Sequence, residues 1–503
     1  MDTTTHEQDR LENGLEDRLN DRLNDSALLR TQLFVDGEWR DGKGEAFDVL
    51  DPGNGSLVAR MSAATAADVE DALAAAEAAF GGWAATTAPE RAKVMRRWYE
   101  LIVEHADDLA TILTAEQGKP WAEARGEILY GAGFVEWYAE ECKRVYGDVI
   151  PTNNAGRRLL TVRQPVGVTA AITPWNFPSA MILRKVAPAI AAGCPMVVKP
   201  ADETPLSATA LAELAHRAGV PAGVLAVVPG PAEEVGGVLT GSPVVRALSF
   251  TGSTAVGKLL MRQCAGTVKK LALELGGNAP LIVFDDADLD LAVAGAMASK
   301  FRNAGQTCVC ANRILVQSGI HDAFVERLSA AVAALTVGYG FDEGSEQGPL
   351  ISDEAVAKVQ RHIDDAVAGG AQVVQGGGTH ELGGTFFEPT LLTGVRGDML
   401  VAREETFGPL AAVIRFETEE EAVALANDTE FGLAAYFFTG SLGRTWRVGE
   451  ALDFGVVGIN TGLISYEGAP FGGVKESGLG REGSRHGIDE FTEMKYLCID
   501  GLA

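Results

Sequence analysis

The chain has 503 residues, 47% of them hydrophobic and 22% charged, so it is too apolar to be disordered and long enough for two or three packed units. Its 42 basic and 69 acidic residues give a formal net charge of -27, which repels nucleic acid and anionic membranes, and we expect neither as a partner. The six cysteines and seven histidines are scattered, apart from the pair Cys308 and Cys310, which predicts no metal site and favours a reducing compartment over a disulfide framework.

The first 30 residues are predicted to form a disordered or marginally helical tail. They are strongly polar and contain neither the apolar core of a secretory signal nor a stretch long enough to span a bilayer. We therefore expect a cytoplasmic protein. An ordered domain is predicted to start at about Thr31, where a short strand enters a turn and segments with helical periodicity follow.

Short apolar runs in the middle of the chain, each followed by a helix-like segment, predict a parallel sheet built from β-α-β units. These runs cover residues 166–173, 195–199, 224–230 and 246–250. The alternation resumes after Gly277 and continues to about Gly472, which predicts a second α/β unit.

Two further stretches, residues 146–163 and 491–499, are predicted strands that fit neither unit. Such strands either bridge subunits or form the edges of a sheet.

The segment FRNAGQTCVCANR contains the best candidate for a nucleophile. Cys308 follows a helix-like stretch and lies among the small and polar residues Gly305, Gln306 and Thr307. A thiol in such a loop can react, whereas the alternative is a small buried side chain with a structural role only.

A carboxylate and an amide in two other segments could assist a nucleophile. Glu274 precedes Gly276 and Gly277, where the backbone can approach a ligand closely, and a raised pKa would make it a general base. Asn176 lies between a predicted strand and a helix start, where its amide could donate to a developing oxyanion. A glutamate satisfied by backbone N–H groups and an asparagine that serves only the turn are the alternatives.

A strand-to-helix turn in SFTGSTAVGK offers a candidate phosphate site. Gly252 and Gly257 stand on either side of Ser253, and glycines at such a turn can expose N–H groups to a pyrophosphate. The pattern is neither the G-x-G-x-x-G fingerprint nor a Walker loop, so it is weak by itself.

Together these segments resemble the aldehyde dehydrogenase superfamily from about Thr31 to Leu502. The matching motifs occur in the family's order and spacing, as PWNFP, VVKPA, FTGSTAVG, LELGG, GQTCVCANR, EETFGP and PFGGVKESGLGRE. The resemblance implies an α/β fold of the aldehyde dehydrogenase type, assembled as a homodimer or homotetramer. It places a Rossmann-type nucleotide-binding domain at residues 31–145 and 164–276, a catalytic domain at 277–480, and a small β oligomerisation element at 146–163 and 488–503.

The resemblance also implies the catalytic roles. Cys308 attacks the aldehyde to give a thiohemiacetal, whose oxyanion is stabilised by the Asn176 amide and the Cys308 backbone N–H, and loss of hydride leaves a thioester. Glu274 then activates the water that hydrolyses the thioester, which favours a free acid as product. Lys185 and Glu482 match a proton-relay pair in relatives.

The implied cofactor is a nicotinamide dinucleotide. Lys199 and Glu405 would hold ribose hydroxyls, and Ser253 the pyrophosphate. The full predicted set is Trp175, Lys199, Asp202, Gly252, Ser253, Gly257, Leu275, Glu405 and Phe407. Asp202 favours NAD over NADP because an anion there would bind a 2′-hydroxyl and repel a 2′-phosphate, although its short side chain leaves NADP open.

Within the superfamily the chain resembles the succinate semialdehyde dehydrogenases, through SKFRNAGQTCVC, GLIS, PFGGVKESGLGREGSRHGIDEF and the closing KYLC. The resemblance implies that Arg184, Arg302 and Ser465 hold the substrate carboxylate, the alternative being that either arginine closes a structural ion pair. Glu467 departs from the expected pattern, since a carboxylate pointing into an anion pocket would weaken this assignment.

Other functions stay open. Glutarate semialdehyde, or another ω-carboxy aldehyde, is the second substrate candidate, because one methylene discriminates by only about 1–3 kcal/mol. A catalytically silent protein of the same fold is the alternative of a different class. Relatives with the CVC sequence include some regulated by a disulfide, so Cys310 is either a redox partner of Cys308 or a buried structural residue.

Overall fold

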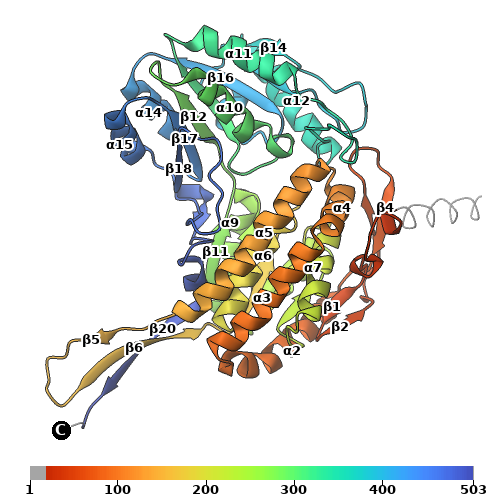
Figure 1. The fold of residues 1–503 in the computed structure, drawn as a ribbon, viewed down its shortest axis with the longest axis vertical. Helices are drawn as coiled ribbons and strands as arrows, with labels where there is room; N and C mark the ends of the chain where they lie inside the picture. The colour runs from red at the N-terminus through yellow and green to blue at the C-terminus, as the bar shows by residue number, and fades with distance from the viewer. Residues whose placement is uncertain (1–18, 502–503) are drawn as a thin grey trace, which may run out of the picture.

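The computed structural model describes residues 19–501, and its central element is an eight-stranded sheet (Figure 1). Across the sheet the strands are β19 (Gly478–Leu479), β11 (Lys270–Glu274), β10 (Val245–Thr251), β7 (Val168–Ile172), β8 (Met196–Lys199), β9 (Leu225–Val227), β1 (Leu33–Val35) and β2 (Glu38–Arg40). The five strands from β11 to β9 are parallel, and they include all four apolar runs predicted to form a parallel sheet. The predicted α/β class is confirmed.

Helices cover this sheet, and one of them carries charges into the core. The helices are α2 (Ala66–Ala85), α3 (Ala88–Glu104), α4 (Ala106–Gln117), α5 (Trp121–Glu141), α6 (Ala180–Ala192), α7 (Leu206–Arg217), α8 (Ala232–Gly241) and α9 (Thr254–Cys264). Every residue of α6 is buried, because the helix packs against α5 as well as β7 and β8. Arg184 and Lys185 lie on α6 and therefore need partners inside the protein.

A seven-stranded sheet forms the second α/β unit. Its strands, in order, are β14 (Gln372–Gln375), β15 (Thr390–Thr393), β16 (Leu410–Phe416), β13 (Ala311–Gln317), β12 (Ala279–Val283), β17 (Ala434–Phe438) and β18 (Val456–Ile459). Its helices are α10 (Leu289–Lys300), α11 (His321–Ala333), α12 (Asp353–Ala368), α13 (Leu400–Arg403), α14 (Glu419–Asn427) and α15 (Leu442–Ala451). Strands β12 and β17 are buried throughout, as expected for a parallel sheet covered on both faces.

A three-stranded antiparallel sheet projects from the body as an arm (Figure 1). It consists of β5 (Val149–Ile150), β6 (Arg158–Pro165) and β20 (Thr492–Ile499), so the two stretches that fitted neither unit pair with each other. A separate hairpin is formed by β3 (Phe47–Leu50) and β4 (Leu57–Met61). The short 3-10 helices are η1 (Ser26–Leu28), η2 (Cys142–Arg144), η3 (Ala265–Thr267), η4 (Arg302–Gly305), η5 (Lys475–Ser477) and η6 (Gly487–Phe491).

Two predicted boundaries differ from the structure. Residues 1–18 of the predicted tail lie outside the described residues, but the following residues pack on the body: Leu28 is buried and Asp25 forms an ion pair with Arg217. The ordered body therefore begins before Thr31. At the other end, β19 pairs with β11, although the sequence assigned these residues to the catalytic domain. Across residues 19–501, no helix is both long and apolar enough to cross a membrane.

Candidate active site

Several candidate residues lie just beyond the carboxyl ends of parallel strands, where ligands bind in open α/β sheets. Asn176 follows β7, and Ser253 follows β10 at the start of α9. Cys308 comes from the other unit, in the loop between η4 and β13. The two units thus bring their candidate residues to one place.

Cys308 lies where two cavities meet. One cavity has a volume of about 350 Å³ and contains the arginines, and the other has about 390 Å³ and contains most of the residues predicted to bind the cofactor. Cys308, Phe177 and Met181 line both. A thiol in this position can reach a ligand on either side.

The loop that carries Cys308 is held in a strained conformation. Asn303 and Ala304 have positive φ angles of 51° and 54°, which non-glycine residues adopt only when their surroundings impose it. The Asn303 backbone N donates to the Glu123 carboxylate at 3.0 Å. The predicted close approach at Gly277 is explained by the same loop, since a Cβ there would lie 2.3 Å from the Cys308 carbonyl oxygen.

The Cys308 thiol is strongly affected by its surroundings. Burial raises its pKa to about 12, while Arg184 lowers the pKa and Glu405 raises it. The thiol is therefore protonated at neutral pH in this state, and attack on an aldehyde requires a base or a further positive charge nearby.

Asn176 is buried beside Cys308 and is held through its backbone. Its side-chain Nδ2 donates to the Gln306 carbonyl at 3.0 Å. Its own carbonyl accepts hydrogen bonds from Lys119 Nζ at 2.7 Å and from Asn303 Nδ2 at 2.9 Å. An amide nitrogen has two hydrogens, so one remains for a ligand. Sequence reasoning missed Lys119 and Asn303.

Glu274 is a buried carboxylate without a partner. It is 3% exposed, and neither of its oxygens accepts a hydrogen bond from any described residue. Burial, and next the charge of Glu482, raise the pKa of Glu274 well above its usual value. The alternative of a glutamate satisfied by backbone N–H groups is wrong. The side chain lies against Gly472, where a Cβ would be 2.9 Å from Oε1, and it lines neither cavity.

Glu482 pairs with both cations of α6. Its Oε1 lies 2.5 Å from Lys185 Nζ, and its Oε2 lies 2.9 Å from Arg184 Nη2. Although burial favours the protonated acid, Lys185 and Arg184 hold the pKa of Glu482 below its usual value. The Arg184 guanidinium also stacks over the Phe471 ring at 4.1 Å. Arg184 therefore lines the first cavity in a direct ion pair, but it shares that single carboxylate with Lys185.

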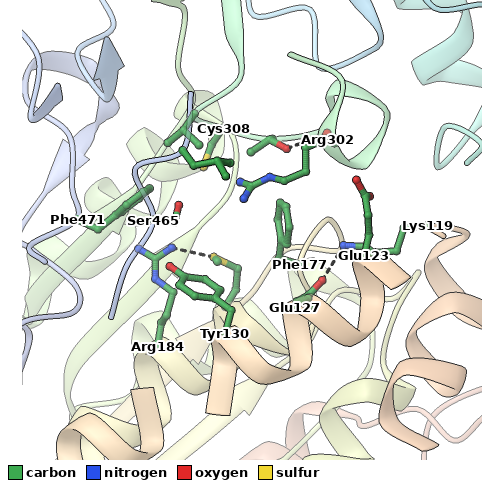
Figure 2. A pocket seen from close by; sticks show the side chains of 15 residues that line it. Lys119, Glu123, Glu127, Tyr130, Phe177, Arg184, Arg302, Cys308, Ser465 and Phe471 are labelled. Atoms are coloured by element: carbon green, nitrogen blue, oxygen red, sulfur yellow. Dashed lines mark hydrogen bonds and ion pairs between the residues drawn. The ribbon is translucent and has the colours of Figure 1, made fainter. Parts of the chain in front are cut away.

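Arg302 faces the same cavity without a direct ion pair, although the buried carboxyl of Glu123 lies near enough for the Arg302 charge to act on its pKa. Its guanidinium lies 5.3 Å from the centre of the Phe177 ring, and within residues 19–501 it forms no ion pair or hydrogen bond through its side chain. Figure 2 shows Arg302, Arg184 and Ser465 around the space that Cys308 faces. The carboxylate of Glu467 does not enter this space, because it packs against α5, where a Cβ on Gly133 would lie 3.2 Å from Cδ.

The second cavity contains most of the predicted cofactor residues. Its lining includes Trp175, Gly252, Ser253, Leu275, Glu405 and Phe407. Gly277 N donates to Glu405 at 2.9 Å, and burial raises the pKa of Glu405 to about 7. Lys358 also lines this cavity and was not predicted.

The structure places the other three predicted cofactor residues outside this cavity. Lys199 Nζ is bound to Asp202 at 2.8 Å, and Asp202 lines a neighbouring cavity. Gly257 packs under Leu275, since a Cβ there would lie 2.4 Å from its Cδ2, so its role is close packing.

Comparisons with known proteins show which family the chain resembles along nearly its whole length. Residues 39–497 match the aldehyde dehydrogenase family. A glutarate-semialdehyde dehydrogenase of Pseudomonas aeruginosa is 59% identical over 476 residues, which cover 94% of this chain and 99% of that protein. The NADP(+) succinate-semialdehyde dehydrogenase GabD of Escherichia coli is 60% identical over 475 residues, covering 94% and 98%. A crystal structure of succinate-semialdehyde dehydrogenase from Burkholderia pseudomallei superposes with a TM-score of 0.95 at 60% identity, covering 95% of this chain and 100% of that one.

Proposed function

This chain belongs to the aldehyde dehydrogenase family, and we propose that it oxidises succinate semialdehyde to succinate, with glutarate semialdehyde as the second candidate. The observation that carries the proposal is the unpaired guanidinium of Arg302 in the cavity that ends at Cys308. An aldehyde carbon bound at the thiol would direct the far end of a short chain toward this cation. A carboxylate there gains a charge-assisted hydrogen bond, which an uncharged aldehyde lacks.

The same cavity suits both semialdehydes. Ser465 and Tyr130 line the cavity beside the arginines and offer hydroxyl groups to the same carboxylate. The relatives from Pseudomonas aeruginosa and Escherichia coli are named for glutarate and succinate semialdehyde, which also supports an anionic tail. Since one methylene changes selectivity by only about 1–3 kcal/mol, we expect turnover of both substrates.

In the proposed mechanism the Cys308 thiol first gives its proton to Glu274, whose charge lies near enough to raise the pKa of the thiol, and that proton passes on through Lys185 and Glu482 before Cys308 acts as a thiolate. Its sulfur forms a bond to the aldehyde carbon, and the carbonyl oxygen takes the negative charge, which the free amide hydrogen of Asn176 and the Cys308 N–H stabilise. A bound nicotinamide dinucleotide supplies the acceptor for the hydride that leaves this adduct. Glu274 then takes a proton from the water that attacks the thioester, and the Cys308 thiolate leaves as the acid forms. Lys185 and Glu482, whose charges shift the pKa of Glu274, would act as a relay for that proton, one proton leaving the pair toward solvent as the other enters it.

The second cavity fits a dinucleotide. Gly252 and Ser253 lead into α9, and the first amides of a helix have no partner within it, which suits a pyrophosphate. Glu405 would accept hydrogen bonds from ribose hydroxyls. Trp175 and Phe407 contact each other edge to face, with ring centres 5.5 Å apart, and provide an aromatic wall.

We propose NAD as the preferred cofactor because the region around Asp202 is acidic. Asp202 lines a neighbouring cavity that shares Glu203 and Glu354 with the cofactor cavity. The carboxylates around it are Asp48, Asp51, Glu116, Asp202, Glu203, Asp353 and Glu354. Burial raises the pKa of Glu116 to about 8, and Asp202 is paired with Lys199, so the repulsion of the 2′-phosphate of NADP would come mainly from the other carboxylates. The Escherichia coli relative is nevertheless named for NADP(+).

We propose that the arm formed by β5, β6 and β20 joins subunits into a homodimer or homotetramer. Strand β20 exposes Met494, Tyr496 and Ile499, apolar side chains that a partner subunit would cover. A cytoplasmic location is also proposed, because all six cysteines are described and all are free thiols.

The direct test is cofactor reduction by the purified full chain. Succinate semialdehyde, glutarate semialdehyde and butanal are each offered with NAD and with NADP, and Cys308→Ala serves as the control that lacks the nucleophile. We expect turnover with both semialdehydes, at least about tenfold higher kcat/KM than with butanal, and faster reduction of NAD. Equal kcat/KM for all three aldehydes would refute the substrate assignment, and turnover by Cys308→Ala would refute the covalent mechanism.

A further inference from the structure

A buried ion pair beside the active site has no part in the mechanism above. Lys119 Nζ lies 2.6 Å from Glu127 Oε2, and both side chains are 1% exposed. Lys119 stands just before α5, and Glu127 lies in the second turn of that helix. Both line the substrate cavity (Figure 2). Buried ion pairs contribute little net stability, so this pair needs another explanation.

The pair holds the turn that carries Asn176 from two sides. Lys119 Nζ donates to the Asn176 carbonyl at 2.7 Å. The other oxygen of Glu127 accepts hydrogen bonds from the backbone N of Ser179 at 2.9 Å and of Ala180 at 3.1 Å. These amides belong to the start of α6, three and four residues after Asn176. The turn is thereby fixed to α5.

A third group connects this turn to the nucleophile. Asn303 Nδ2 donates to the same Asn176 carbonyl at 2.9 Å and also to the Gln306 carbonyl at 3.3 Å. The Asn176 side chain donates to that Gln306 carbonyl at 3.0 Å. Asn303 and Gln306 both belong to the loop that ends at Cys308. The carbonyl of Asn176 is therefore the point at which α5 and the cysteine loop are fixed to each other.

We propose that Lys119 is a positioning residue, which together with Glu127 and Asn303 fixes the Asn176 carbonyl so that its side-chain amide points to the oxyanion formed at Cys308. This inference rests on the proposed role of Asn176. An oxyanion donor acts only at about 2.7–3.1 Å from the charged oxygen, so a small shift of the turn removes most of its effect. We expect Lys119 not to bind the substrate carboxylate, because Glu127 already matches its charge.

The test compares Lys119→Met with Lys269→Met, since Lys269 is also a buried lysine that donates to a backbone carbonyl, at Ser242, away from the site. Lys119→Met should lower kcat/KM by about 10- to 100-fold, a substantial part of the loss expected for removing an oxyanion donor. The loss should be the same for succinate semialdehyde and butanal. Lys269→Met should retain wild-type kcat/KM.

Alkylation of Cys308 by iodoacetamide separates positioning of Asn176 from damage to the thiol. Displacement at a saturated carbon forms no oxyanion, so the alkylation rate of Lys119→Met should stay within about twofold of wild type. In an Asn176→Ala background, Lys119→Met should add less than about a twofold loss, because the group it positions is already gone.

Three results would overturn the inference. A loss confined to KM for succinate semialdehyde would make Lys119 a ligand of the substrate carboxylate. A parallel fall in alkylation would mean that it supports the thiol, and a full additional loss in Asn176→Ala would mean that it acts independently of Asn176. Full activity of Asn176→Ala by itself would instead refute the oxyanion role in the proposed function.

A second variant covers the case in which Lys119→Met does not fold. Asn303→Gly removes the other donor to the Asn176 carbonyl and tolerates the positive φ at that position. It should show the same equal loss for both aldehydes. Wild-type kcat/KM in this variant would also contradict the inference.

Discussion

The two walls of the substrate cavity each present an arginine, one in a direct ion pair and the other without one. On the helix wall, formed by α6, Arg184 is 2% exposed at its side chain and bound to Glu482. On the loop wall, formed by the segment before Cys308, Arg302 forms no direct ion pair with any described residue. A cation already bound to a carboxylate of the protein has less to gain from a second anion than a cation without such a bond. The role of an arginine near an active site therefore depends on whether a carboxylate of the protein already forms an ion pair with it.

The partner of the helix wall is distant in sequence. Glu482 stands 297 positions after Lys185, so no local pattern on α6 could show that its two cations share one carboxylate. Glu274 lies near enough to this cluster that Glu482 raises its pKa. We therefore propose that the groups around the helix wall transfer protons, whereas the loop wall recognises the substrate.

The largest expected effect is that of Glu274→Gln, at the carboxyl group behind the helix wall. The amide cannot accept a proton, so hydrolysis of the thioester should stall after the first hydride transfer. Steady-state turnover should fall by at least about 100-fold, the range of a lost general base. Rapid mixing should show one burst of reduced cofactor per site. A wild-type steady-state rate would place the base elsewhere.

Arg302→Met, measured beside Arg184→Met, tests the difference between the walls directly. Losing one charge-assisted hydrogen bond costs about 1.5–3 kcal/mol, so Arg302→Met should raise KM for succinate semialdehyde by about 10- to 150-fold and leave KM for butanal nearly unchanged. Arg184→Met should change the ratio of the two KM values much less, because Arg184 is paired with Glu482. Equal ratios in the two variants would remove the distinction between the walls.

The pH dependence should differ between the walls in the same way. Burial raises the pKa of Glu274, and a base works only when ionised, so kcat should fall as pH decreases through this raised pKa. KM for succinate semialdehyde should stay flat between about pH 6 and 9, because a guanidinium remains charged. In Glu274→Gln the remaining rate should lose this pH dependence. A KM that rises with pH would mean that a titrating group binds the carboxylate instead.

Sequence reasoning predicted the features that depend on residues close together in the sequence. The apolar runs predicted the parallel strands, since a buried strand needs continuous apolar residues and the α/β alternation is visible along the chain. It also singled out Cys308, Asn176 and Arg302, which the structure places around one site. These residues lie in short motifs at the ends of strands and helices.

Sequence reasoning missed what depends on contacts between distant segments. Lys119 and Asn303 both donate to the Asn176 carbonyl, although their positions in the sequence are 184 residues apart. A lysine just before a helix is common, so the sequence did not indicate this contact. The orientation of Glu467 was equally undetermined, because only packing against α5 turns it away from the cavity. The packing of residues 19–30 was missed because their polar composition predicts disorder. A few contacts with distant residues, such as the ion pair of Asp25 with Arg217, are enough to hold them on the body.

The smallest expected effect on basal activity concerns Cys310, on the far side of the loop wall. Its Sγ is 3.4 Å from the Lys300 carbonyl, it is 7% exposed, and burial raises its pKa, so it makes no contact that the reaction needs. Cys310→Ala should retain at least about half of wild-type kcat/KM, as expected for a small side-chain truncation outside the reacting groups.

Peroxide treatment then decides between a redox and a structural role for Cys310. Peroxide converts the Cys308 thiolate to a sulfenic acid with release of hydroxide, and attack by the Cys310 thiolate would form the disulfide and release a second hydroxide. The bond requires the two β-carbons to approach to about 3.5–4.5 Å, which a bend of the loop between η4 and β13 would have to supply. If this occurs, dithiothreitol should restore activity to oxidised wild type. Oxidised Cys310→Ala should recover less, because its sulfenic acid has no resolving thiol and proceeds to acids that thiols cannot reduce. Identical inactivation and identical recovery in both proteins would leave Cys310 with a structural role alone.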